Sequence, residues 1–426
     1  MCGLVSRKSA FVFAHFIVRT SYVNFHMHFR ERSIPMRTAT FIILMLCGAI
    51  SFAQQSVSPA VPATAGQSNA FTRIDAPAVY VYRDELGRTA TATINVIFAS
   101  DFPANARPAF TRAAEIWSYL VNSSQVITIN AQWNPLAVGT LAQTKPDSLF
   151  KNFPNAPKQN MLYPVALAEA LSGQNLNGSA TELTIEVDSN QANWYFGTDG
   201  NTPAGKYDLV TTIMHEIAHG LGFGHSFSVN GLIGGWGSLS SYSGFATIYD
   251  DACIVGDNHG TSIYRLTNTS QYPNPSQLLG NELRGNNVYF DGLNVFRINN
   301  NSLAKLYAPS AWSAGSSIAH LDELTYFAGN SNSLMSPQQN MAEAIHSPGE
   351  IGMAMLQDMG WTINRVITIT KPMAGQVWTQ GTSDTIWWTD NKYLGGLLSI
   401  QLWKRNTVGG YDFYSTIATV VSNQGR

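Results

Sequence analysis

The sequence predicts an α+β domain with a mixed sheet, followed by a small all-β sandwich domain at the C-terminus. Between residues 91 and 221, β-branched stretches of alternating pattern are interleaved with stretches of helical period. From about residue 367 the pattern changes to short alternating strands separated by turn residues. The chain has 426 residues, of which 45% are hydrophobic, and this is enough for two or three packed domains.

The charge composition bears on the class of partner. Charged residues make up only 12% of the chain, the formal net charge is -2, and like charges form no run. Binding of a phosphate backbone requires a basic face. We therefore expect no nucleic-acid partner.

The N-terminal segment, residues 1–53, resembles an address for export. Starting from Met36, the chain has Arg37, an apolar run over 41–50 and the small residues "SFA" before Gln54. This order is typical of a secretory signal peptide, and the apolar run is too short for a membrane span. We expect translation to start at Met36, the mature chain to have no stable transmembrane span, and the protein to be secreted or held at the cell surface. A signal anchor that is not cleaved is the alternative.

The elements of the first domain follow in order after a lead-in over 54–75, which is rich in Ser, Pro and Ala and is predicted to be flexible. A domain spanning 76–364 then contains a strand, a helix, two further strands and a second helix. The corresponding ranges are 91–98, 104–124, 125–133, 182–190 and 209–221.

The rest of the chain divides into three parts. Residues 226–330 are rich in Gly, Ser, Asn and Tyr and predict an insertion of loops and short strands. A helix over 347–361 is expected to begin with Ser347 as N-cap, Pro348 at its first position and Glu350 completing a capping box. Residues 367–426 contain few strands and predict an incomplete sandwich. Cys253, the only cysteine after residue 53, is expected to be a buried small hydrophobe.

The stretch "MHEIAHGLGFGH" (214–225) contains the candidate residues for metal binding and catalysis. Asp208 is a plausible N-cap for the helix that contains it, and His215 and His219 then lie one turn apart on one face. Two imidazoles at this spacing can bind one metal ion, and neutral imidazole suits Zn²⁺. Glu216 adjoins the first ligand, where it can accept a proton from a metal-bound water.

This helix is expected to end at Gly222. A glycine adopts backbone conformations that end a helix at little steric cost. The chain could then bend so that His225 becomes a third ligand. Three protein ligands leave a fourth position open for water, which is the pattern of a catalytic zinc site.

The motif "HEIAHGLGFGH" resembles the long zinc-binding motif of the metzincin metalloproteases. The resemblance implies a zincin-like catalytic domain, with His215, His219 and His225 as zinc ligands and Glu216 as general base. It also implies that substrate backbone pairs with an edge strand, for which 182–190 is the candidate. Because residues 54–214 contain no cysteine, latency through a prodomain cysteine is excluded if the signal is cleaved as predicted.

The resemblance further implies a methionine in a tight turn beneath the metal. Met335 in "SNSLMSPQQN" is the best candidate, although the insertion must loop out because Met335 lies 110 residues (335 minus 225) after His225. Some relatives have a tyrosine soon after this methionine that adds a metal contact. The stretch after Met335 has none, so we expect water alone in the fourth position.

The remaining candidates are weaker. Residues 187–201 are rich in Asp, Asn and Gly and could coordinate Ca²⁺. His259, His320 and His346 lack ligand spacing and are expected to be surface or hydrogen-bonded histidines. The segment after residue 367 resembles a β-sandwich module of cell-surface proteins, similar to the yeast wall-protein type, which implies a spacer or attachment role.

The sequence therefore predicts a secreted zinc endopeptidase that acts on protein or peptide substrates. One alternative is a surface-binding or adhesion protein with a vestigial or structural zinc site, and the intact Glu216 argues against it. Another is a zinc hydrolase that acts on a bond other than the peptide bond.

Overall fold

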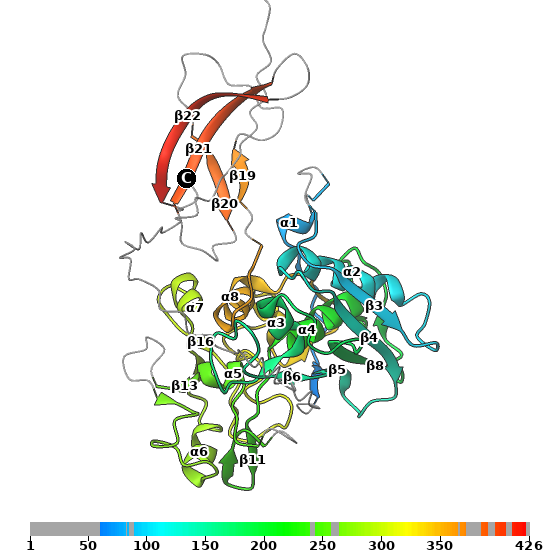
Figure 1. Ribbon diagram of the computed structural model, residues 1–426. Coiled ribbons are helices and arrows are strands. Elements are labelled where there is room, and N and C mark those ends of the chain that lie inside the picture. The colour runs from blue at the N-terminus through cyan, green and yellow to red at the C-terminus, as the bar shows by residue number, and fades with distance from the viewer. Residues whose placement is uncertain are drawn as a thin grey trace, which may run out of the picture. The chain divides into compact units, whose positions relative to one another are not determined.

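The computed structural model describes residues 60–81, 83–84, 89–238, 243–256, 264–364, 367–371, 385–390, 397–405 and 411–422. The chain divides into two compact units. The larger unit is formed mainly by residues 52–366, and the smaller one contains the strands from residue 367 onward (Figure 1). The predicted signal segment lies outside the described residues.

The core of the larger unit is a mixed six-stranded sheet in the order β17-β1-β5-β8-β4-β3. Strands β3, β4 and β8 are parallel to one another, while β5 runs antiparallel to both β8 and β1. The alternating burial along β4 matches the alternating pattern of its sequence. The strands are β1 (Val61–Ala65), β3 (Ile94–Phe98), β4 (Ile127–Asn134), β5 (Thr140–Pro146), β8 (Leu183–Asp188) and β17 (Gln338–Gln339).

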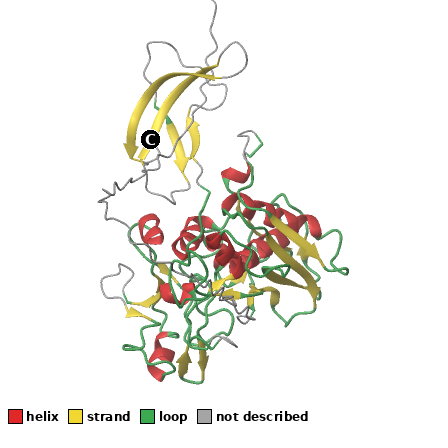
Figure 2. Cartoon of the chain, in the orientation of Figure 1, coloured by secondary structure: helices red, strands yellow, loops and turns green. Residues whose placement is uncertain are grey.

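Helices cover this sheet, and the pair α2 and α4 forms the centre of the packing (Figures 1 and 2). Trp117 of α2 is fully buried, and its indole Nε1 donates a hydrogen bond to the backbone oxygen of Met214 in α4 at 3.0 Å. The helices are α1 (Ala78–Val81), α2 (Arg107–Leu120), α3 (Val165–Ser172), α4 (Leu209–Leu221), α5 (Ile248–Ala252), α6 (Gln277–Glu282), α7 (Leu293–Ile298) and α8 (Gly349–Met359).

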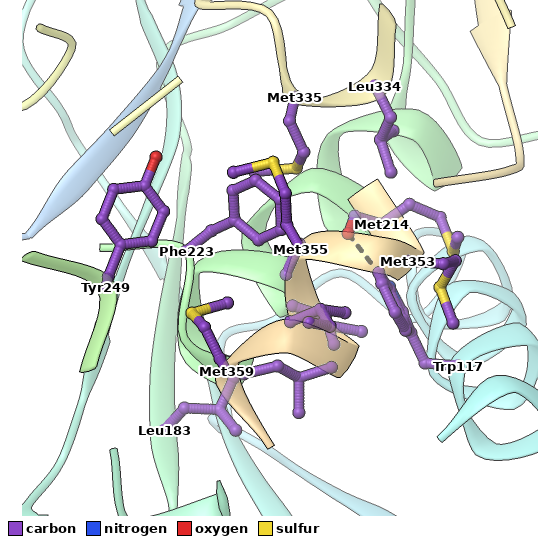
Figure 3. Close-up of a cluster of buried hydrophobic side chains, with 14 of the residues drawn as sticks. Trp117, Leu183, Met214, Phe223, Tyr249, Leu334, Met335, Met353, Met355 and Met359 are labelled. Atoms are coloured by element: carbon purple, nitrogen blue, oxygen red, sulfur yellow. Dashed lines mark hydrogen bonds between the residues drawn. The ribbon is translucent and has the colours of Figure 1, made fainter. Parts of the chain in front are cut away.

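Sulfur and aromatic side chains fill the space beneath α4. Figure 3 shows Met214, Met335, Met353, Met355 and Met359 in one buried cluster with Trp117, Phe223 and Tyr249. Flexible thioethers fit irregular gaps between elements that cross at different angles. The helix that carries His215 and His219 therefore packs against a continuous apolar cluster.

The larger unit also contains short strands outside the six-stranded sheet. Those of the insertion form the sheet β14-β13-β15-β16 and the pair β11-β12. The short strands are β2 (Thr72–Ile74), β6 (Leu149–Phe150), β7 (Tyr163–Pro164), β9 (Trp194–Tyr195), β10 (Tyr207–Asp208), β11 (Ser228–Asn230), β12 (Ile233–Gly235), β13 (Cys253–Val255), β14 (Tyr264–Arg265), β15 (Val288–Phe290), β16 (Ala304–Lys305) and β18 (Glu343–Ile345). Cys253 is fully buried in β13, as expected.

The smaller unit contains two antiparallel strand pairs, β19 with β20 and β21 with β22. Their bounds are β19 (Ile367–Lys371), β20 (Trp387–Asp390), β21 (Leu397–Arg405) and β22 (Tyr411–Ser422).

Three predictions about elements were wrong. The lead-in is not all flexible, because residues 61–65 form β1 inside the main sheet. The stretch 182–190 is not an edge strand, because β8 lies between β5 and β4. Ser347 is not the N-cap of the last helix: Pro348 holds that position, and α8 has no side-chain cap.

Candidate metal centre

Helix α4 positions the first two candidate ligands. Asp208 caps its N-terminus, as predicted, and accepts a hydrogen bond from the Thr211 backbone N–H at 2.8 Å. The Asp208 carboxylate also accepts hydrogen bonds from the Thr202 and Thr211 hydroxyls, and His346 Nε2 lies 2.9 Å from one of its oxygens. Every residue of α4 is buried, so His215 and His219 face the interior one turn apart.

Three histidine nitrogens converge at one point. The Nε2 atoms of His215 and His219 lie 2.9 Å apart, and His320 Nε2 lies 3.1 Å from the first and 3.2 Å from the second. These three side chains are the group in the described part of the chain that could hold a metal ion. His320 was expected to be a surface or hydrogen-bonded histidine without ligand spacing; its ring is hydrogen-bonded, but it is fully buried and lies in this cluster, so its dismissal as a candidate ligand was wrong.

The opposite ring nitrogens fix the orientation of the three imidazoles. Each Nδ1 lies within hydrogen-bond distance of a backbone carbonyl: His215 of Leu334 O at 2.6 Å, His219 of Phe223 O at 2.5 Å and His320 of Ser316 O at 2.8 Å. A carbonyl only accepts, so each Nδ1 carries the proton and donates it. Each Nε2 then presents a lone pair to the other two.

Three lone pairs that face one another repel unless a cation lies between them. Burial disfavours protonation of these rings: it lowers the pKa of His215 to about 4 and lowers the pKa values of His219 and His320 well below the usual range. A proton therefore does not supply the missing positive charge near neutral pH. Histidine ligands that donate their other N–H to a carbonyl are the usual arrangement around a protein-bound metal, so these residues fit a metal ion.

His225 does not join this cluster. Its Nε2 lies 2.7 Å from the backbone oxygen of Ser317, three residues before His320. Burial lowers the pKa of His225 to about 4, so the neutral ring donates its Nε2 proton to that carbonyl. The prediction of His225 as third ligand is thus not supported by this geometry, which instead makes His225 a support for the loop that carries His320.

The loop at 316–320 is held in an uncommon conformation. Ile318 has φ of 68°, a region that β-branched residues rarely enter. The Ile318 carbonyl accepts a hydrogen bond from the Tyr249 hydroxyl at 2.8 Å, while His225 holds the adjacent carbonyl of Ser317. Contacts from two elements therefore stabilise the strained turn that directs His320 toward α4.

Glu216 is fully buried next to the histidine cluster. Its Oε1 accepts a hydrogen bond from the Ala63 backbone N–H at 3.0 Å. Burial raises the pKa of Glu216 to about 8, and the Thr144 hydroxyl and the Ala63 amide oppose this increase in part. The Thr144 hydroxyl lies near the Glu216 carboxyl group. However, neither this hydroxyl nor Glu216 Oε2 makes a hydrogen bond of ordinary geometry within the described residues. One carboxylate oxygen thus remains without a partner.

Gly222 ends α4, as expected, with a different consequence for the site. Its φ of 136° lies in a region that favours glycine. The bend does not bring His225 to the cluster. It places the Phe223 carbonyl where that oxygen accepts the Nδ1 proton of His219.

Met335 lies in a short 3₁₀ turn, η1 (Ser333–Met335), that adjoins the site. Its side chain is fully buried and lies near Phe223 and Met355 (Figure 3). The preceding residue, Leu334, supplies the carbonyl that orients His215. The role of Met335 as the methionine beneath a metal stays a prediction.

The other candidates lie apart from this site. In the stretch 187–201, Asp188 accepts hydrogen bonds from the backbone of Leu136 and Asn190, and Asp199 accepts them from Tyr195 and Asn201. A Ca²⁺ site there stays a prediction. His259 lies outside the described residues. Over the part of the chain that is described, no helix combines the length and apolar character needed to cross a bilayer.

Comparison with known proteins gives one match. A family model described as SPBPB7E8-like matches residues 118–233, which is less than half of the chain. No curated protein and no solved structure matches the chain. The matched segment contains α4 with His215, Glu216 and His219, as well as His225, but ends before His320.

Proposed function

We propose that this protein is a secreted zinc-dependent endopeptidase. The observation that carries the proposal is the convergence of three neutral, buried imidazole nitrogens beside a buried carboxylate. Three nitrogen ligands suit Zn²⁺ and leave a fourth coordination position open, as catalytic rather than structural zinc sites do. The proposed ligands are His215, His219 and His320.

In this proposal the chain's own residues divide the remaining work. Zinc, when bound, polarises the scissile carbonyl and makes water a better nucleophile at neutral pH. In the ionised form that the positive charge of a bound ion would favour, Glu216 would accept a proton from the attacking water and pass it to the leaving amine, because it adjoins His215 and has one carboxylate oxygen without a hydrogen-bond partner among the described residues. The carbonyls of Leu334, Phe223 and Ser316 keep the imidazoles in the tautomer that binds metal.

The test compares the wild type with Glu216→Gln for zinc content and for hydrolysis of casein, with and without a chelator. We expect about one zinc per chain in both proteins, and cleavage by the wild type alone and only without chelator. Glu169→Gln is the matched control: Glu169 is also a buried carboxylate that accepts backbone N–H bonds, but it lies on α3. It should keep both zinc and activity.

Three results would contradict the proposal. A chain without zinc would remove the metal centre. Activity that survives in Glu216→Gln would remove the general base. The third result is bound zinc without cleavage of any protein. It must hold both with the strand β1, whose Ala63 contacts Glu216, in place and after that strand has been released. It would favour an adhesion protein with a structural zinc site, or a hydrolase that acts on another bond.

A further inference from the structure

The strand β1 occupies an unusual place for a segment of its composition. It lies between β5 and β17, antiparallel to the first and parallel to the second. Hydrogen bonds hold it on both sides: Ala65 N–H donates to Gly139 O at 2.8 Å, and Gly66 N–H donates to Gln339 O at 2.7 Å. Addition of an extended segment to a sheet edge is a common mode of peptide recognition.

The side chains of β1 that face α4 lie on both sides of Glu216. Ala63 is 2% exposed and lines a small cavity with His215, Thr211 and Glu343. Val61, two residues earlier on the same strand face, lines a second cavity with His219. The Ala63 N–H between them points at Glu216 Oε1. This segment therefore follows the path along which an extended peptide would pass the histidine cluster.

We propose that β1 is an autoinhibitory strand, which fills the peptide-binding groove between β5 and β17 and engages Glu216 until it is displaced. This inference rests on the proposed function, because it identifies the groove as a substrate site. With β1 in place, Glu216 is fully buried, so water from solvent reaches it only when the strand opens locally, which leaves the intact chain a low basal activity. A substrate also cannot pair with β5, because β1 already takes that edge.

The composition of β1 is compatible with its displacement from the groove. Its sequence is VPATA, so it buries little apolar area, and backbone hydrogen bonds supply most of its attachment. The residues that follow, 67–70, are exposed. An endoprotease can therefore reach this segment, and a cut there would leave β1 attached on that side by non-covalent contacts alone: its ladder and hydrogen bonds such as those of Ala63 with Glu216 and of Ser68 with Asn340.

The experiment places a recognition site for a specific protease between Ala70 and Phe71, both exposed, in the otherwise intact chain. Casein hydrolysis is measured before and after the cut, with zinc content measured in parallel. We expect hydrolysis to rise at least about tenfold after the cut at constant zinc content, and a synthetic peptide of residues 60–67 to slow it again. Equal rates before and after the cut would overturn the inference.

A second variant tests the contact itself. Ala63→Pro removes the N–H that donates to Glu216. It should be more active than the wild type without any cut. Ala60→Pro, just outside the strand, is the control and should behave like the wild type. Cleavage of the intact chain at the Pro62–Ala63 bond would show that β1 is a substrate, which would overturn the inhibitory role.

Binding separates failure of this inference from failure of the proposed function. A fluorescent peptide of residues 60–67 should bind the cut chain and not the intact chain, whether or not the protein hydrolyses peptides. Binding without hydrolysis would retain β1 as a cover and contradict the peptidase. Hydrolysis that is independent of the cut, or no peptide binding to the cut chain, would contradict the role of β1.

Discussion

At the level of single residues, His225 and His320 lie in the reverse of the positions that sequence spacing suggests. His225 lies close to α4 in sequence but holds the Ser317 carbonyl, whereas His320 lies 101 residues from His219 and meets its Nε2. A sequence motif indicates which residues close together in the sequence can lie close together in space. It gives no information on a loop far along the chain that tertiary packing brings to the same place. No local signal around His320 could have identified it.

This reversal leads to a direct test by metal analysis. His320→Ala should abolish stoichiometric zinc binding, because it removes a proposed ligand. His225→Gln retains a donor for the Ser317 carbonyl and should bind zinc with an affinity at most about tenfold weaker, near the lower bound for loss of an outer partner. If His225→Gln lost zinc and His320→Ala kept it, the third ligand would be His225.

The lowered histidine pKa values predict how the zinc-free protein responds to acid. The pKa of His225 is about 4 when folded and about 6.5 when unfolded, so below pH 6.5 the unfolded chain binds more protons. The corresponding stability is fully present above pH 6.5 and is lost as the pH falls toward 4. The loss from His225 is about 3 kcal/mol, since one pKa unit corresponds to about 1.4 kcal/mol.

Urea unfolding at pH 7.5 and pH 4.5 measures this loss in the presence of a chelator. Other buried groups also titrate in this range, among them Asp250, whose pKa burial raises to about 6. The informative quantity is therefore the difference between the wild type and His225→Gln, which should lose less stability on acidification. Equal losses in both proteins would contradict the buried neutral state of His225.

At the level of elements, the sequence predicts those whose pattern reflects burial, such as α4 with its Asp208 cap and the strands β3, β4 and β8. It does not predict β1 or β5. The strand β1 has small side chains and a proline, and its pairing depends on backbone hydrogen bonds to edges that exist only after folding. Any segment able to extend could make such bonds, so its own sequence carries little signal.

The end of α4 gives a prediction at this level. Gly222→Ala forces a non-glycine residue to adopt φ near 136°, which costs on the order of 1–3 kcal/mol. It should also shift the Phe223 carbonyl that orients His219, and so weaken zinc binding. Gly224→Ala is the matched control, because its added methyl group meets no atom within 4 Å.

Thermal unfolding and zinc titration of the two variants decide the outcome. Gly222→Ala should show a lower midpoint and weaker zinc binding, while Gly224→Ala should match the wild type in both. If the two variants were indistinguishable, the positive φ at Gly222 would not contribute to the site.

At the level of the whole molecule, the site belongs to the larger unit. All of its proposed residues, from Ala63 to Leu334, lie within residues 52–366, which form most of that unit. A chain that ends at Val366 should therefore keep zinc, casein hydrolysis and the thermal midpoint of the larger unit, since independent folding units lose little when separated. Loss of zinc binding on this truncation would show that the β-strand unit supports the centre.

The positions of the three proposed ligands also have a consequence for chain topology. His215 and His219 lie on one helix, and His320 follows after about a hundred residues that contain most of the insertion. A single ion bound to all three would tie that length of chain into a closed ring, much as a cross-link does. Ring closure restricts the unfolded ensemble more as the enclosed length grows. A bound ion would thus restrict the unfolded chain as a disulfide does, in a protein whose described part has one free cysteine, Cys253. Removing the ion with a chelator would then lower the stability as reducing a disulfide does.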